Sequence, residues 1–146
     1  MIATRLRKNP IDVGSALATL ASDGTSGALV TFTGHVRGKP GSTLELQHYP
    51  GMTEKMMAEV AAEASRRFEI DSGIVIHRHG VMAPGDVIVL VAVASRHRGD
   101  AFRAAEFLID WLKTRAPFWK RETAADGTSA WVEARRSDDE KAADWT

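Results

Sequence analysis

The chain has 146 residues, of which 44% are hydrophobic and 26% charged, and its 19 basic and 19 acidic residues give a formal net charge of zero. This length and composition predict one globular domain over residues 1–146 with a buried core. The balanced charge gives no general electrostatic attraction for nucleic acid or a membrane surface. Because there is no cysteine, disulfides, thiolate metal sites and cysteine nucleophiles are excluded.

The first residues, Met1 to Leu6, lack the apolar core of a signal peptide, and no apolar run reaches the ~20 residues needed to cross a bilayer. We therefore expect a cytoplasmic protein with no membrane partner. Next along the chain, Asn9 and Pro10 predict the cap and the first position of a short amphipathic helix that ends near Leu20.

Strands and a helix alternate in the following part. Gly27 to Val36 is rich in β-branched residues and predicts a strand, and the Gly- and Pro-containing segment from Gly38 to Ser42 predicts a flexible loop. Leu44 to His48 alternates apolar and polar residues, as a short strand does. Thr53 to Phe68 has apolar residues at helical spacing, and Thr53 is its expected cap.

The second half begins with a hairpin signal. Gly73 to Met82 and Asp86 to Ser95 flank the turn sequence Ala83-Pro84-Gly85, and the second of these segments is apolar enough for a strand buried on both faces. Asp100 to Thr114 carries one apolar stripe and predicts a helix.

A helix-to-strand junction is expected around Pro117, which cannot lie inside a continuing helix. Phe118 to Glu122 and Ser129 to Glu133 predict a second hairpin around Asp126-Gly127, and residues 135–146 form a charged tail that we expect to be loosely held. The order of elements predicts an α+β domain with a mainly antiparallel sheet.

Basic residues gather where three predicted elements end. The clusters are Gly34 to Gly38, Ser95 to Asp100, and Lys113 to Arg121. Strand ends and helix starts are places where backbone N–H groups and cationic side chains can converge on an anion. A small phosphorylated substrate would suit such a place.

Each cluster also has a purely structural interpretation. Lys113 and Arg115 stabilise a helix C-terminus whatever the function. Lys120 could be an exposed strand residue, and Phe118 and Trp119 could be core residues. A single histidine such as His97 could simply end a strand.

Several common chemistries have no motif here. The chain has no phosphate-binding loop, dinucleotide-binding glycine motif or nucleophile elbow. His77 and His79 could share one face of a strand, but no third ligand accompanies them, so we expect no metal and no cofactor. Lysines remain as reactive groups, because neighbouring cations raise the neutral fraction of a lysine. Lys113 and Lys120 fit that description.

Four runs of this sequence resemble the large, catalytic subunit of the molybdopterin synthase family, and the likeness follows nearly the whole chain in order. The runs are Gly34 to Arg37, Leu46 to Met52, Ser95 to Phe102, and Lys113 to Glu122. The resemblance implies an α/β hammerhead fold with an added antiparallel β subdomain. It also implies a sulfurtransferase, with a homodimer at the centre of a heterotetramer.

The reaction implied by this resemblance is the conversion of cyclic pyranopterin monophosphate into molybdopterin. The sulfur arrives as the C-terminal thiocarboxylate of a small ubiquitin-like partner that ends in Gly-Gly. An enzyme without cysteine agrees with a sulfur that the partner delivers.

The resemblance also implies residue roles. Lys113 is similar to the essential catalytic lysine of the family and Lys120 to its second important lysine. The expected substrate-binding residues are His35, Val36, Arg37, His97, Arg98, Arg121 and Glu122.

Two alternatives remain open at this point. The chain could be a non-catalytic anion-binding module for nucleotide or RNA, although its zero net charge and the lack of an aromatic-studded basic strand argue against RNA. It could also be a synthase-like subunit that has lost activity, against which the intact lysine pair argues.

Overall fold

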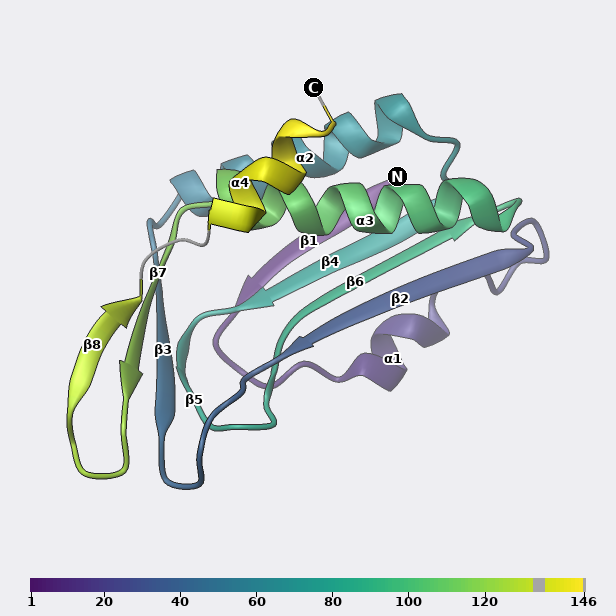
Figure 1. Ribbon diagram of the computed structural model, residues 1–146. Coiled ribbons are helices and arrows are strands. Elements are labelled where there is room, and N and C mark those ends of the chain that lie inside the picture. The colour runs from purple at the N-terminus through teal and green to yellow at the C-terminus, as the bar shows by residue number, and fades with distance from the viewer. Residues whose placement is uncertain (133–135, 146) are drawn as a thin grey trace.

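The computed structural model of the chain describes residues 1–132 and 136–145. They form two four-stranded sheets, with strand orders β1-β4-β6-β2 and β5-β3-β7-β8 (Figure 1). The strands are β1 (Ile2–Arg7), β2 (Ala28–His35), β3 (Thr43–His48), β4 (Ser72–Arg78), β5 (Gly80–Met82), β6 (Val87–Ser95), β7 (Phe118–Thr123) and β8 (Ser129–Val132). The helices are α1 (Val13–Ala18), α2 (Met52–Arg67), α3 (Arg98–Arg115) and α4 (Arg136–Ala143).

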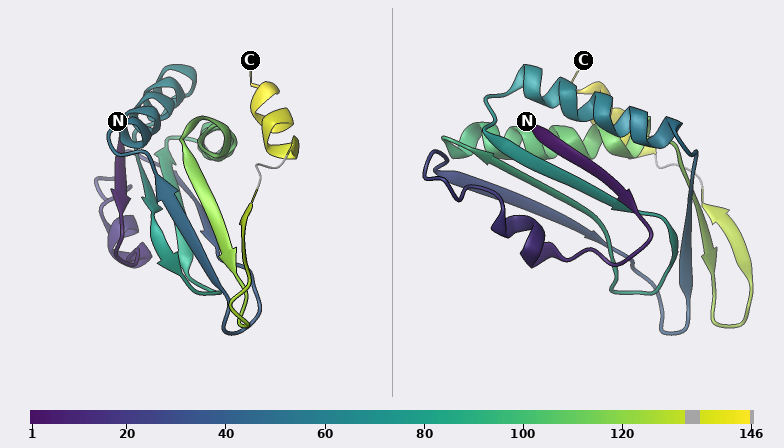
Figure 2. Two further views of the ribbon diagram at one scale, coloured as in Figure 1. Left: turned by 90° about the vertical axis from the view of Figure 1, so that its left-hand side faces the viewer. Right: turned by 180° about the vertical axis from the view of Figure 1, so that it is seen from behind.

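The first sheet and two long helices enclose the main core. α2 and α3 lie side by side over one face of this sheet (Figures 1 and 2). Central strand β6 is buried from Val89 to Ser95, as its apolar sequence predicted. α2 contributes Met57 and Val60 to the core, and α3 contributes Phe107, because apolar residues three and four positions apart share one helical face.

The second sheet stands at one end of the first and has its own small core (Figure 1). Its buried residues are Val36, Leu44, Leu46 and Met82. The predicted hairpin of β7 and β8 is confirmed for Ser129–Val132, whereas Glu133 lies outside the described residues. β7 also pairs antiparallel with β3. The expected α+β class is therefore confirmed, with the added antiparallel sheet as a distinct layer.

The sequence prediction of the first sheet was incomplete in two places. Strand β1 was not predicted, and it pairs with β4 in parallel, so this sheet is mixed. The segment Gly73 to Met82, expected as one strand, is divided between the two sheets as β4 and β5. Gly80 has a φ of +95°, a left-handed conformation that glycine adopts without steric cost, and the chain changes sheets beside it.

Two helix starts were also predicted wrongly. α1 begins at Val13, and the side chain of Asp12 caps it by accepting a hydrogen bond from the Ser15 N–H at 3.1 Å. This cap replaces the expected one at Asn9. α2 begins at Met52 behind Gly51, so Thr53 lies inside the helix rather than capping it.

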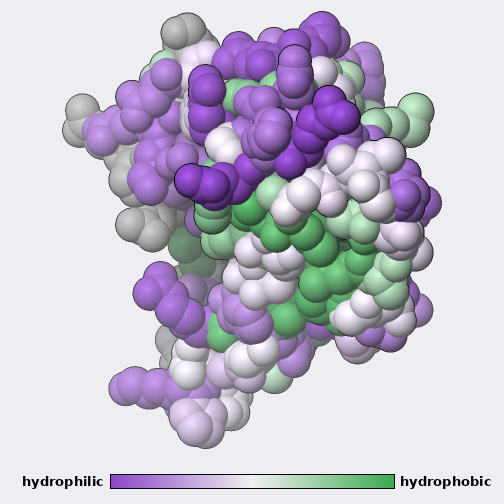
Figure 3. Space-filling model, turned by 90° about the vertical axis from the view of Figure 1, so that its right-hand side faces the viewer, coloured by the Kyte–Doolittle hydropathy of each residue, from purple (hydrophilic) through white to green (hydrophobic). Residues whose placement is uncertain are grey.

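β2 is an edge strand of the first sheet and exposes apolar side chains. Leu29 and Phe32 are each 38% exposed, and Phe102 at the start of α3 is 59% exposed. The side of the molecule where β2 begins and α3 starts carries an apolar area bordered by hydrophilic side chains (Figure 3).

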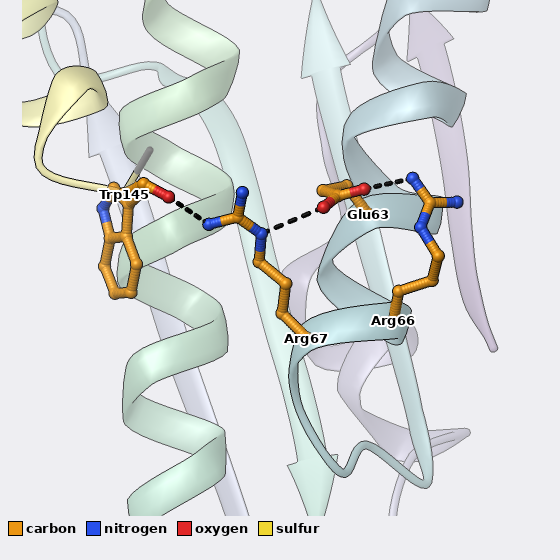
Figure 4. A network of polar contacts seen from close by, with 4 residues as sticks. All are labelled: Glu63, Arg66, Arg67 and Trp145. Carbon is orange, nitrogen blue, oxygen red and sulfur yellow. Dashed lines mark hydrogen bonds and ion pairs between the residues drawn. The ribbon is translucent and has the colours of Figure 1, made fainter.

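The expectation of a loosely held tail is wrong for residues 136–145. The indole N–H of Trp145 donates to Asp110 Oδ2 at 2.8 Å, and its ring packs edge-on against Phe107 and Phe68. Arg67 donates to the backbone carbonyl of Trp145 and also pairs with Glu63 (Figure 4). Aromatic burial thus holds α4 on α3. Arg135 lies outside the described residues.

Within residues 1–132 and 136–145, no helix combines the length and apolar character required to span a membrane.

Candidate functional site

The helix-to-strand junction around Pro117 is present as predicted. α3 ends at Arg115, Ala116 has extended backbone with ψ of 122°, and β7 starts at Phe118. Lys113 is exposed in the last turn of the helix, and Lys120 is exposed in the strand. The junction thus presents one lysine from each element on the protein surface.

Thr53, in the first turn of α2, holds the junction in place through its hydroxyl group. Its side chain is fully buried, and its hydroxyl donates to the Pro117 carbonyl at 2.8 Å. The same hydroxyl accepts a hydrogen bond from the Tyr49 N–H at 2.9 Å. One side chain therefore ties the end of α3 to the start of α2, because each backbone group needs a partner once it is buried.

His77 at the end of β4 holds the junction from the other side. Its ring stacks on the Phe118 ring, with centroids 4.0 Å apart and planes 17° from parallel. His77 Nδ1 lies 2.8 Å from the Arg78 carbonyl oxygen, so this nitrogen carries the hydrogen. Burial lowers the pKa of His77 to about 4, helped by the charges of Lys120 and His79 and opposed by the hydrogen bond to Arg78.

This half-buried histidine predicts an acid-sensitive fold. Unfolded His77 has its ordinary pKa of 6.5, so between that pH and about 4 the unfolded state binds more protons and stability falls as pH falls. We expect the free energy of unfolding to drop by about 2–3 kcal/mol across this range because of His77. Urea unfolding at several pH values should show the drop, and His77→Phe should flatten it. An equally steep dependence in the variant would contradict this assignment.

The two faces of β7 carry different residues. Lys120 pairs with Leu46 and Glu122 pairs with Leu44, so both share the face that borders the small core. Arg121 lies on the opposite face, where its guanidinium is 5.9 Å from the Trp131 ring centroid and donates to Ser129 Oγ at 3.2 Å. Lys120 and Arg121 are thus neighbours in sequence but point to opposite sides of the sheet.

The three basic clusters do not meet within one copy of the chain. Ala28 pairs with Ser95 and His35 pairs with Val87, so the first two clusters lie at opposite ends of the β2–β6 ladder. The first two clusters are seven strand residues apart, which corresponds to about 23 Å. Arg98 and Lys113 lie at opposite ends of α3, about 22 Å apart along its axis.

The remaining predicted residues have varied surroundings. Val36 is buried in the small core, and its backbone N–H and carbonyl bond to Asp86 and Gly85 at 2.9 and 2.8 Å. His35 is exposed, with Nε2 2.9 Å from the Thr33 hydroxyl. Arg37, His97 and Arg98 are exposed. Of these five residues, Val36 is buried, and His35, Arg37, His97 and Arg98 have exposed side chains near the ends of their strands or helices.

His77 and His79 contact different aromatic rings. His79 stacks on His48 with centroids 4.3 Å apart, whereas His77 stacks on Phe118. Among residues 1–132 and 136–145, no group of three or more histidine, aspartate or glutamate side chains is arranged to hold a metal ion.

Two hollows of the described surface lie away from the lysines. One of ≈ 260 Å³ runs between α2 and α3 beside Trp111, and one of ≈ 350 Å³ lies beside Asp23 and Asp71. Neither is lined by Lys113 or Lys120. Both lysine side chains are exposed in a single copy.

Thr53 and His77 are the contacts that sequence reasoning missed. The sequence indicated Thr53 as a helix cap and His77 as part of a strand, and both interpretations depend on local pattern alone. Their partners, Pro117 and Phe118, are 64 and 41 residues away. The one available signal was the proline itself, whose carbonyl follows a helix end and needs a donor from elsewhere.

Comparisons with known proteins now identify the family. The sequence model of the MoaE protein family matches residues 6–115, more than half of the chain. This chain belongs to the MoaE family. It is 51% identical over 140 residues to the molybdopterin synthase catalytic subunit of Escherichia coli strain K12, with 93% of each protein covered.

Solved MoaE-family structures have the same fold. The molybdopterin biosynthesis MoaE protein of Burkholderia ambifaria matches with a TM-score of 0.85 at 45% identity, covering 99% of this chain and 98% of that one. Molybdopterin synthase of Staphylococcus aureus matches with a TM-score of 0.78 at 35% identity, covering 88% of this chain and 95% of that one. The family resemblance of the four sequence runs is therefore confirmed.

Proposed function

We propose that this chain is the catalytic subunit of a cytoplasmic molybdopterin synthase. In this function it transfers sulfur from the C-terminal thiocarboxylate of a small ubiquitin-like partner to cyclic pyranopterin monophosphate and forms the dithiolene. The observation that carries the proposal is the lysine pair on either side of Pro117 in a MoaE-family chain without cysteine. A chain with no thiol cannot carry the sulfur itself, which agrees with delivery by a partner.

Lys113 and Lys120 have the chemistry that this transfer needs. As a thiocarboxylate sulfur attacks a pterin carbon, negative charge develops on the atoms that accept its electrons, and a fixed ammonium stabilises that charge. Lys113 is proposed for this role because its backbone is held by the last turn of α3. Lys120 lies on the inner face of β7 and assists from the strand side.

The phosphate of the substrate needs further cations, and the proposed homodimer supplies them. Arg98 and Lys113 lie at the two ends of α3 in one chain, too far apart to contact one small molecule. A two-fold axis through the β2 edge would set two α3 helices antiparallel and place His97 and Arg98 of one copy near Lys113 of the other. The apolar side chains of β2 and its unpaired edge favour burial in such an interface.

Within this arrangement the predicted residues divide by role. Arg37, His97, Arg98 and His35 are proposed to contact the pterin and its phosphate, because their side chains are exposed near element ends. Val36 contributes through its buried position between His35 and Arg37. Glu122 shares the face of Lys120, whereas Arg121 would have to act from the outer face of the sheet.

Reconstitution tests this function. The purified chain, a thiocarboxylated Gly-Gly partner and cyclic pyranopterin monophosphate should together yield a dithiolene product detected by mass spectrometry. The same partner with an ordinary carboxylate is the matched control and should give none. No product with the thiocarboxylated partner, from a chain that binds it, would contradict the proposal.

A further inference from the structure

The ring of His77 is held in an unusual way for a residue outside the predicted site. Stacking on Phe118 fixes its plane, and the Arg78 carbonyl 2.8 Å from Nδ1 fixes its rotation. Phe118 is the first residue of β7, and Lys120 follows two positions later on the same face of that strand. A ring lying on Phe118 is therefore a near neighbour of the Lys120 side chain.

The fixed orientation of the His77 ring determines which of its nitrogens can accept a hydrogen bond. Nδ1 carries the hydrogen because its partner is a carbonyl oxygen, which can only accept. In the neutral ring Nε2 is then an acceptor with a lone pair. Burial keeps the ring neutral near physiological pH, and the charge of Lys120 acts on it in the same direction.

We propose that His77 is a positioning residue for Lys120, in which the imidazole stacked on Phe118 offers Nε2 as an acceptor that holds the Lys120 ammonium over the inner face of the second sheet. The importance of this contact for turnover depends on the function proposed above. The contact itself does not.

The neighbouring Arg78 and His79 side chains make other contacts, so Lys120 is the candidate donor to His77 Nε2. Arg78 on the same strand donates to the Lys8 carbonyl at 3.0 Å and lies 3.6 Å from Asp86, so its guanidinium is engaged away from the ring. His79 stacks on His48 rather than on His77. From β7, the charge that acts on His77 is that of Lys120.

Two substitutions of His77 separate its stacking from its acceptor. His77→Phe keeps a flat ring over Phe118 but removes both nitrogens, and His77→Gln restores a polar acceptor at a similar distance from the backbone. His79→Phe is the matched control, because it changes the neighbouring histidine that stacks on His48. Thermal unfolding of each variant verifies that it is folded.

The decisive measurement is the rate at which acetic anhydride modifies Lys120 at mildly alkaline pH, followed by peptide mass spectrometry with Lys113 as the internal reference. Removing an acceptor destabilises the ammonium form, so Lys120 in His77→Phe should react about threefold faster or more relative to Lys113. His77→Gln should lie close to the wild type, and His79→Phe should be unchanged.

Kinetics provide the second readout. In the reconstituted reaction, kcat of His77→Phe should fall by about tenfold while the KM for the partner is unchanged. An unchanged or slower modification of Lys120 in folded His77→Phe would overturn the proposal, whatever the activity. If the wild type formed no product, the proposed function would fail, but the modification rates would still decide the role of His77.

Discussion

Replacing Lys113 with alanine is expected to lower product formation by about a thousandfold or more. The reason is that a fixed cation in a site shielded by partner and substrate stabilises charge that exists only in the transition state. Lys113 is exposed in the last turn of α3, so its removal should leave the fold and the affinity for the small partner intact. Single-turnover product formation and a binding titration with the partner measure these two effects separately.

Arg115→Ala is the matched control for this experiment. Both residues are cations in the last turn of α3 and both stabilise the helix C-terminus, but Arg115 lies over the Trp111 ring at 3.9 Å. If helix-end electrostatics explained the effect, the two variants would lose activity equally. Near-normal turnover of Lys113→Ala would show that Lys113 is not a catalytic residue.

Mixing two inactive variants is expected to restore activity if the site spans two copies. Arg98→Ala should weaken substrate binding and Lys113→Ala should abolish turnover, each in its own homodimer. In a mixed dimer one of the two sites receives Lys113 from one chain and Arg98 from the other, so it is complete. Random exchange should therefore restore about a quarter of the wild-type sites. Product formation before and after subunit exchange at subsaturating substrate measures this recovery.

A second mixture provides the control. Lys113 and Lys120 border the same junction of one chain, so Lys113→Ala mixed with Lys120→Ala should restore nothing. Recovery in neither mixture would show that Arg98 and Lys113 do not share a site across copies.

Light scattering should find that the chain is a dimer and that Phe32→Asp on the β2 edge weakens it. This change places a charge on a surface proposed to be buried.

Much of the architecture could be predicted because it depends on short-range pattern. The 3.6-residue period of α2 and α3, the apolar run of β6 and the break at Pro117 all act on neighbouring residues. The failures have the same origin. β1 has no strong local signal and exists through its parallel pairing with β4, and α4 is held by Trp145 on Asp110, 35 residues away.

The sequence by itself determined that a helix ends and a strand begins around Pro117, with Lys113 on one side and Lys120 on the other. It also determined the family through four runs of residues. Only the tertiary structure decided which cations can act together. Strand register places Arg121 opposite to Lys120, and the length of α3 separates Arg98 from Lys113. It also brought Thr53 and His77 onto the junction. These are contacts between distant segments, and the local preferences of a chain do not specify which distant segments meet.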